Sequence, residues 1–121
     1  NGKQLLEKFL PSVVQHSDEA NLYVIDNASS DNSIHWLQQQ YPEITIIQLS
    51  ENLGYAGGYQ QGLKSVEEPY YFLLNSDVEV TENWLQPILD LFTDTNIAAI
   101  QPKILDYKKP EYLNMRVLAV V

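Results

Sequence analysis

Two spacings of apolar residues alternate along the chain. Apolar side chains at helical spacing predict helices at residues 5–14, 34–41 and 84–92, and we expect the segment from Gly54 to Gly62 to open a further helix. Short apolar runs predict extended segments, at residues 22–25, 44–49, 70–74 and 97–104. Strands that are apolar along their whole length and alternate with helices of about 10 to 15 residues are typical of a parallel sheet covered on both faces. We therefore predict an α/β fold with an open, mainly parallel sheet and helices on both of its faces.

Polar residues and prolines mark where these helices begin and end. The cluster Ser29-Ser30-Asp31 is suited to capping the second helix, and Thr81 to capping the fourth. The second helix should stop at Tyr41-Pro42, because proline disfavours a helical residue before it. Pro11 lacks an N–H donor, so we expect the first helix to kink or restart there.

The composition excludes several classes of function. The 121 residues include 7 basic and 16 acidic side chains, a formal charge of −9, with 45% apolar residues and no cysteine. Such a chain fits one globular domain and excludes disulfides, thiolate metal sites and cysteine nucleophiles. Its acidic balance argues against binding to nucleic-acid phosphates. The apolar runs are too short for a membrane span and the first residues lack a secretory signal, so we expect a soluble protein in a reducing compartment.

The end of the chain differs in character from the rest. Residues 1–100 hold 3 basic and 14 acidic side chains, net −11, whereas residues 101–121 hold 4 basic and 2 acidic ones, net +2. Met115 is followed by Arg116 and the apolar run 117–121, like a translation start before a buried strand. We expect this run to supply the strand that an α/β domain of this kind normally has before its first helix, through circular permutation, exchange between molecules or an altered order of segments. The alternative is an ordinary strand that ends a fragment.

Open α/β sheets bind ligands at the carboxyl ends of their strands. Here those positions are residues 26–31, 51–58 and 75–79, which carry most of the polar signals of the sequence.

Three motifs at these positions resemble a known family. The segments are Val24-Ile-Asp-Asn-Ala-Ser-Ser-Asp-Asn-Ser33, Asn52-Leu-Gly-Tyr-Ala-Gly-Gly-Tyr-Gln-Gln-Gly-Leu63 and Leu73-Leu-Asn-Ser-Asp-Val78. In this order they resemble the nucleotide-binding half of family 2 glycosyltransferases, and most of all the bacterial rhamnosyltransferase-like members. The resemblance implies a Rossmann-like A-type glycosyltransferase fold (GT-A) and an inverting transfer of a sugar from a nucleotide diphosphate to a saccharide or lipid-linked acceptor. It also implies work in the cytoplasm on bacterial cell-surface polysaccharide, at the inner face of the membrane.

The resemblance covers most of residues 1–107, which we expect to form the donor-binding half of a single partial glycosyltransferase domain spanning residues 1–121. Residues 113–121 form a divergent tail.

The negative charge of the domain leads us to expect a divalent cation at the site. A chain at −9 repels a nucleotide diphosphate, so a cation such as Mn²⁺ or Mg²⁺ should bridge the two. We expect Asp77 to hold this ion and Asn75 to add a carbonyl oxygen or a water-mediated contact. The resembled family carries Asp-X-Asp here, and the first position is Asn75, so the ion should bind usefully when donor phosphates complete its shell. The alternative is a polar turn after a strand.

The other two motifs predict contacts to the donor nucleotide of a UDP- or dTDP-sugar. Asn27 stands where the family places an acid that accepts a hydrogen bond from the base, and Asp26 either contacts the nucleotide or orients the loop. Asn52, Gly54 and Gly58 belong to a loop whose backbone can approach a ligand closely, with helix N-terminal amides directed at an anion. The alternatives are a capped helix start for residues 26–31 and helix-to-strand packing for the glycines.

The sequence selects no catalytic base. Glu79, Glu82 and Asp106 are available carboxylates without a feature that distinguishes one of them. In the resembled family the base lies later in the domain, so we expect a donor-binding portion. Two other functions stay open: a receiver-like signalling module that binds magnesium, and an inactive nucleotide-sugar-binding or interaction domain.

Overall fold

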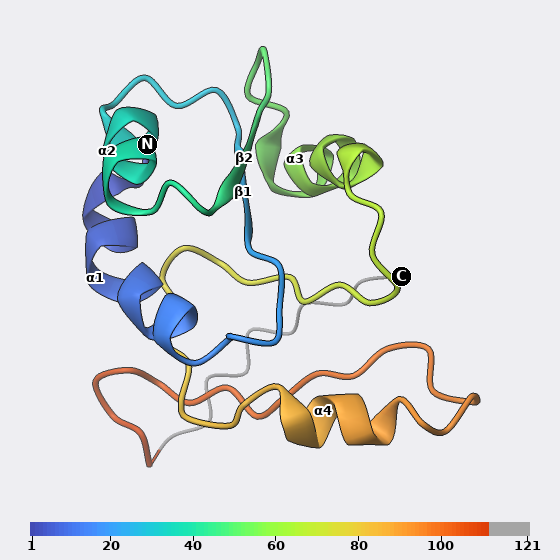
Figure 1. Ribbon diagram of the computed structural model, residues 1–121. Coiled ribbons are helices and arrows are strands. Elements are labelled where there is room, and N and C mark those ends of the chain that lie inside the picture. The colour runs from blue at the N-terminus through green and yellow to red at the C-terminus, as the bar shows by residue number, and fades with distance from the viewer. Residues whose placement is uncertain (112–121) are drawn as a thin grey trace.

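The computed structural model describes residues 1–111 of the chain. Its elements follow the order α1 (Lys3–Gln15), β1 (Tyr23–Asp26), α2 (Ser33–Gln40), β2 (Thr45–Gln48), α3 (Gly54–Gly62), the short 3₁₀ helix η1 (Leu63–Ser65) and α4 (Gln86–Leu91) (Figure 1). The first four elements, α1, β1, α2 and β2, alternate between helix and strand, as predicted for an α/β fold. The run at 117–121, predicted from the sequence as a displaced strand, lies outside the described residues.

The two strands are parallel and adjacent in one sheet, with Tyr23 opposite Thr45 at one end and Asp26 opposite Gln48 at the other. Figure 1 shows α1 and α2 on one side of these strands and α3 on the other. The predicted arrangement, a parallel sheet with helices on both faces, is therefore confirmed for these two strands.

Side chains from α1, from α2 and from the residue just before β2 form the core on one face of the sheet. Leu10, Leu37 and Ile44 are buried together, and Val24 and Ile46 of the strands pack against them. Neighbouring side chains of a strand point to opposite faces. The side chain of Ile25, next to Val24, therefore faces α3. Burial of one leucine of this kind contributes about 1.5–3 kcal/mol.

The other face of β1 is packed closely against α3. A Cβ atom on Gly62 would lie 2.6 Å from Cδ1 of Ile25, which is too close for any side chain larger than hydrogen. Gly62 therefore allows α3 to pack closely against β1.

Two predicted strands are absent from the described residues. Residues 70–74 and 97–104 have no strand assignment, and the sheet within residues 1–111 has two strands. Tyr70 and Tyr71 are about half exposed, at 49% and 48%. The apolar run at 70–74 signals a preference for burial, but a strand also needs a neighbouring backbone to pair with.

The helix boundaries differ from the predicted ones in two places. The fourth helix starts at Gln86 rather than after Thr81, and Asn83 has a φ of +56°, which lies outside the helical region. Pro87 in its first turn favours the later start, because proline needs no partner for an N–H there. The first helix continues through Pro11 without restarting.

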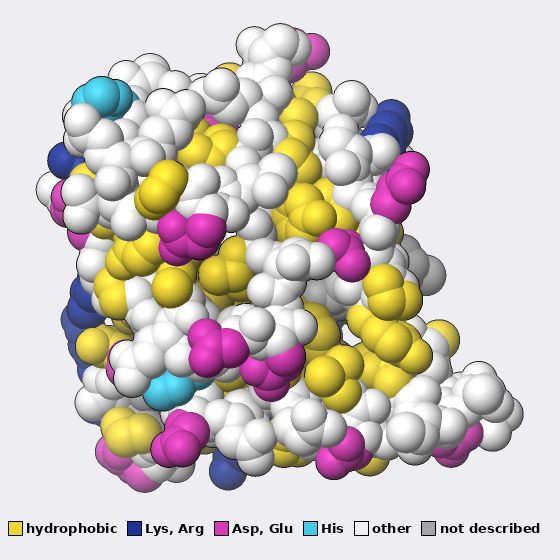
Figure 2. Space-filling view, in the orientation of Figure 1, with side chains coloured by type: hydrophobic (Ala, Val, Ile, Leu, Met, Phe, Trp, Pro, Cys, Tyr) yellow, Lys and Arg dark blue, Asp and Glu magenta, His cyan; other side chains and the backbone are white. Residues whose placement is uncertain are grey.

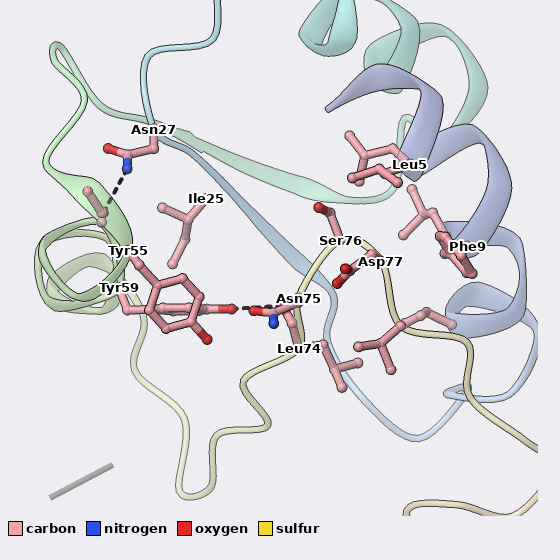
Figure 3. Close-up of a pocket in the computed structure, with 16 residues that line it drawn as sticks. Leu5, Phe9, Ile25, Asn27, Tyr55, Tyr59, Leu74, Asn75, Ser76 and Asp77 are labelled. Carbon is pink, nitrogen blue, oxygen red and sulfur yellow. Dashed lines mark hydrogen bonds between the residues drawn. The ribbon is translucent and has the colours of Figure 1, made fainter. Parts of the chain in front are cut away.

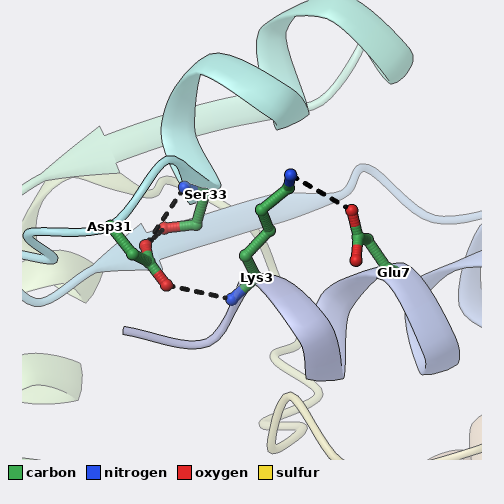
Figure 4. A network of polar contacts seen from close by, with 4 residues as sticks. All are labelled: Lys3, Glu7, Asp31 and Ser33. Atoms are coloured by element: carbon green, nitrogen blue, oxygen red, sulfur yellow. Dashed lines mark hydrogen bonds and ion pairs between the residues drawn. The ribbon is translucent and has the colours of Figure 1, made fainter.

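Asp31 joins the beginnings of α1 and α2 (Figure 4). Its Oδ1 accepts hydrogen bonds from the backbone N–H and the hydroxyl of Ser33, and its Oδ2 accepts one from the N–H of Lys3 at 3.2 Å. Asn32 occupies the N-cap position, so of the predicted capping residues Asp31 is the one that binds the first turn of α2. The hydrogen bond from Ser33 is the main reason that the pKa of Asp31 falls to about 2.

We predict that Asp31 makes the stability of the fold depend on pH in the acid range. Its pKa is lower in the folded than in the unfolded chain, so the ionised carboxylate stabilises the fold above its ordinary pKa of about 3.9. This contribution is lost as the pH falls from about 5 to about 2. Urea unfolding at pH 7 and pH 3 should show a smaller loss of stability on acidification for Asp31→Asn than for the natural chain.

Asp18→Asn is the matched control, since Asp18 is exposed in the loop after α1. An Asp31→Asn variant that loses as much stability on acidification as the natural chain would contradict the role given to Asp31.

Candidate functional site

Residues from four separate segments line one open cavity of about 490 Å³ (Figure 3). Its polar lining comes from the end of β1, the start of α3 and the turn after residue 74: Asn27, Gly54, Tyr55, Gly58, Tyr59, Asn75, Ser76 and Asp77. The rest of the lining is apolar and comes largely from α1. In Figure 3, Asn27 lies on one side of the open middle, and Ser76 and Asp77 lie on the other. The three sequence motifs therefore meet at one place.

The side-chain amide of Asn27 connects the end of β1 to the loop before α3. Its Nδ2 donates to the carbonyl of Gly54 at 2.8 Å and to Oδ1 of Asn52 at 3.2 Å. Its Oδ1 accepts the N–H of Leu53 at 2.9 Å. Both amide protons are used, and the oxygen keeps one lone pair. Asn27 lines the cavity and also holds the loop in place, and its contact with a base stays a prediction.

Asn52 completes this loop without lining the cavity. Its Oδ1 accepts the N–H of Gly54 at 2.9 Å as well as the proton from Asn27. The N–H groups of Leu53 and Gly54 are therefore satisfied within the protein. Anion contacts from the N-terminus of α3 would have to come from the following amides, starting at Tyr55.

Two glycines allow this close arrangement, each for its own reason. Gly54 has a φ of +72°, a conformation that other residues adopt only with strain. A Cβ atom on Gly58 would lie 3.0 Å from Nδ2 of Asn27. The close backbone approach predicted for Gly58 is thus an approach to Asn27, which brings the Asn27 amide against α3.

Asp26 is used inside the loop and does not line the cavity. Its side chain is buried, with 8% exposure, and both carboxylate oxygens lie 3.3 Å from the N–H of Ser29. Ala28 between them has a φ of +56°, which turns the chain back sharply. Of the two roles predicted for Asp26, the structure favours orienting the loop.

The turn with Asn75, Ser76 and Asp77 carries the open carboxylate of the site. All three residues are exposed, and the turn is closed by a hydrogen bond of 3.3 Å from the N–H of Val78 to the carbonyl of Asn75. The Asp77 carboxylate makes no hydrogen bond or ion pair with another residue between 1 and 111. It is accessible to a ligand from solvent.

The oxygens of this turn are of the type that Mg²⁺ and Mn²⁺ accept. The described part of the chain holds no group of three or more acidic or histidine side chains suited to a metal ion. An ion at Asp77 and Asn75 would need further ligands from water or from a bound ligand, and the metal site predicted there stays a prediction.

Tyr59 is a positioning residue whose part in the site the sequence did not reveal. Its hydroxyl donates to the carbonyl of Leu74 at 2.7 Å, so that α3 holds the chain just before the turn at Asn75. Its ring meets that of Tyr55 edge-on, with centroids 5.2 Å apart. Burial is the largest cause that raises the pKa of Tyr59 to about 12, so the hydroxyl stays protonated and keeps donating at neutral pH.

The carboxylates considered as catalytic bases lie outside the cavity lining. Glu79 and Glu82 are exposed, and Oδ1 of Asp106 accepts the backbone N–H groups of Lys108 and Lys109. Asp77 is the one acidic side chain in the lining formed by residues 1–111.

Comparison with protein families supports the assignment of the three motifs, whose residues lie around one cavity. The model of glycosyl transferase family 2 matches residues 1–120. The chain belongs to this family. Membership of glycosyl transferase family 2 confirms the resemblance on the three motifs, and the match continues past Tyr107, where the motif pattern ends. It argues against the receiver-like signalling module.

A curated protein with a similar sequence is the "Teichoic acid poly(glycerol phosphate) polymerase" of Staphylococcus epidermidis, which is 23% identical over 120 residues. The similar stretch covers 95% of this chain and 17% of the polymerase. No solved structure matches the chain. Between residues 1 and 111, no helix has both the length and the apolar character needed to cross a membrane.

We predict that Tyr59→Phe loosens the turn at residues 75–78 from α3. The variant leaves the Leu74 carbonyl without its donor, which should lower the free energy of unfolding by about 1–2 kcal/mol. Amide hydrogen exchange at Val78 should become faster as well. Tyr70→Phe is the control, because the Tyr70 side chain is half exposed. If Tyr59→Phe and Tyr70→Phe gave the same stability and the same exchange at Val78, the positioning role of Tyr59 would be refuted.

Proposed function

We propose that the chain is the donor-binding part of a glycosyltransferase. In this proposal it binds a nucleotide-diphosphate sugar, a UDP- or dTDP-sugar, together with Mn²⁺ or Mg²⁺, and the sugar passes with inversion to a saccharide or lipid-linked acceptor. Membership of glycosyl transferase family 2 supports glycosyl transfer. The observation that carries the donor site is that Asn27, Gly54 and Asp77, from three separate motifs, line one cavity.

Charge supports the part given to the cation. The chain carries a formal charge of −9, so a pyrophosphate approaching the cavity is repelled. Asp77 is exposed and free of partners among the described residues, and the amide of Asn75 adds an oxygen without adding charge. In the proposal Asp77 and Asn75 hold the ion from the protein side, and the donor phosphates supply further ligands. A bound cation neutralises the charge that develops on the leaving nucleoside diphosphate.

The opposite side of the cavity suits the nucleoside. Tyr55 is 51% exposed at the rim, so one face of its ring is available for stacking on the base or the sugar. Asn27 keeps one lone pair on its amide oxygen, which can accept a hydrogen bond from the base. We therefore place the base near Asn27 and the pyrophosphate near Asp77, across the open middle seen in Figure 3.

Proton abstraction from the acceptor is not assigned to these residues. An inverting transfer needs a general base beside the acceptor hydroxyl. Asp77 is the acidic side chain that residues 1–111 place in the cavity lining, and the proposal gives it to the cation. The described residues thus account for donor binding.

The similar polymerase suggests where such a donor-binding domain works. Its name assigns it to the polymerisation of glycerol phosphate in teichoic acid, in the bacterium Staphylococcus epidermidis. By analogy we propose that the acceptor of this chain belongs to bacterial cell-surface polysaccharide and that the protein works in the cytoplasm, at the inner face of the membrane.

We predict that UDP binds more tightly in the presence of Mn²⁺ and that Asp77→Asn removes most of this gain. Loss of one charged ligand should weaken the Mn²⁺-dependent binding about 10- to 100-fold. Isothermal titration calorimetry with UDP and with dTDP, each with MnCl₂ or with EDTA, measures the effect.

Asp18→Asn, which removes an equal charge outside the cavity lining, should bind like the natural chain. Nucleotide binding that is equally strong with EDTA, or that Asp77→Asn leaves unchanged, would remove the cation from the proposal. Absence of binding under all conditions would refute the donor site itself.

A further inference from the structure

The segment that carries Asp77 has no helix or strand to hold it in place. Residues 66–85 have no helix or strand assignment. The turn at 75–78 is closed by the hydrogen bond of 3.3 Å from the N–H of Val78 to the carbonyl of Asn75, which is long for a backbone bond. The Asp77 carboxylate makes no hydrogen bond or ion pair with another residue between 1 and 111. Its position therefore depends on the contacts that hold the backbone on either side of it.

Two such contacts come from two different helices. Before the turn, the hydroxyl of Tyr59 on α3 donates to the carbonyl of Leu74 at 2.7 Å. After the turn, the backbone N–H of Val80 donates to Oγ of Ser12 on α1 at 3.2 Å. Asp77 lies midway along the chain between Leu74 and Val80, and Figure 3 shows its turn between α3 and α1. The carboxylate is thus held from both sides at equal distance along the chain.

The hydroxyl of Ser12 is suited to accept this hydrogen bond. It donates its proton to the carbonyl of Phe9, one turn earlier in α1, at 2.8 Å. A serine hydroxyl has one proton and two lone pairs, so with the proton used inside the helix it is left as an acceptor. Val80 is buried, with 8% exposure, and its N–H would lose a partner that water does not easily replace. Serine is neutral to unfavourable inside a helix, and the contact with Val80 gives Ser12 a task there.

We propose that Ser12 is a positioning residue for Asp77, an inference that rests on the proposed function, in which Asp77 holds the cation. Charge alone does not direct a cation to Asp77, because Asp and Glu side chains are spread over the face of the molecule seen in Figure 2. Position does, because a bridging ion must reach the carboxylate and the donor phosphates at once. Mg²⁺ demands ligands at about 2.0–2.1 Å in near-ideal geometry, so a small displacement of the carboxylate weakens its binding.

The first test is amide hydrogen exchange of the full chain without nucleotide, so that it is independent of the proposed function. Ser12→Ala removes the acceptor of the Val80 N–H. Exchange at Val78, inside the turn, should become about 2- to 10-fold faster, as expected for the loss of one hydrogen bond. Ser12→Thr keeps a hydroxyl that can bond the same helix carbonyl, and it should exchange like the natural chain.

Ser17→Ala is the matched control. Oγ of Ser17 accepts a hydrogen bond of 3.2 Å from Nε1 of Trp84, so this variant also removes a serine acceptor between the end of α1 and the segment at 66–85. Trp84 lies well beyond Asp77 in the chain. Urea unfolding should therefore show a similar loss of stability for Ser17→Ala and Ser12→Ala, whereas exchange at Val78 should stay as in the natural chain for Ser17→Ala.

The second test is isothermal titration calorimetry with UDP, which separates the cation from the nucleotide. Ser12→Ala should weaken UDP binding in MnCl₂ about tenfold, as is typical when a partner that orients a metal ligand is removed. It should leave UDP binding in EDTA unchanged, because Ser12 does not line the cavity. Ser17→Ala and Ser12→Thr should bind like the natural chain under both conditions.

Three results would overturn the inference: equal exchange at Val78 in the natural chain and Ser12→Ala, equal loss of Mn²⁺-dependent binding in Ser12→Ala and Ser17→Ala, or a loss in Ser12→Thr as large as in Ser12→Ala. Weaker UDP binding of Ser12→Ala in EDTA would also overturn it, since that would show a general disturbance of the site. If the natural chain shows no Mn²⁺-dependent binding of UDP, the proposed function fails, and exchange at Val78 still decides whether Ser12 holds the turn.

Discussion

The candidate site depends on a single side-chain amide. Asn27 makes three hydrogen bonds to the loop before α3, and through them the end of β1 and the start of α3 are fixed against each other. The absence of a side chain at Gly58 is a condition of this contact, because a Cβ atom there would lie 3.0 Å from the Asn27 amide. Tyr59, one residue later on the same helix, then holds the third segment at Leu74. α3 is thus the element to which both other motifs are attached.

The acidic side chains near the site have different tasks. Asp26 is buried and binds a backbone N–H of its own loop, and Asp31 binds backbone N–H groups of α1 and α2. Both carboxylates stabilise local structure through charge-assisted hydrogen bonds. Asp77 makes no such bond within residues 1–111. Asp77 is therefore the carboxylate that we propose for the cation, because it is the acidic side chain that residues 1–111 place in the cavity lining, in a chain whose overall charge repels phosphate.

Sequence patterns correctly predicted those helices and strands that depend mainly on interactions between residues near one another in the chain. Apolar spacing correctly predicted the positions of α1 and α2 and of both paired strands, the segment from Gly54 to Gly62 was correctly predicted as α3, and the motif order led to the right family. Residues 70–74 were wrongly predicted as a strand of the described sheet, because an apolar run does not show whether a partner backbone is present. Thr81 was wrongly predicted as a cap, since the positive φ of Asn83 and the position of Pro87 delay the helix. The contacts of Asn27 and Tyr59 join segments distant in sequence, and no periodicity marks such partners.

The central claim is that the three motifs hold one nucleotide and one cation at a shared cavity, and paramagnetic broadening by Mn²⁺ tests it most directly. In two-dimensional amide spectra of the full chain with UDP, substoichiometric Mn²⁺ should broaden the signals of Asn75–Val78 first and those of Asn27 and Tyr55 next. Signals of α4, which contributes no residue to the cavity, should stay sharp. Broadening centred on other acidic residues, or broadening that does not depend on UDP, would contradict the account.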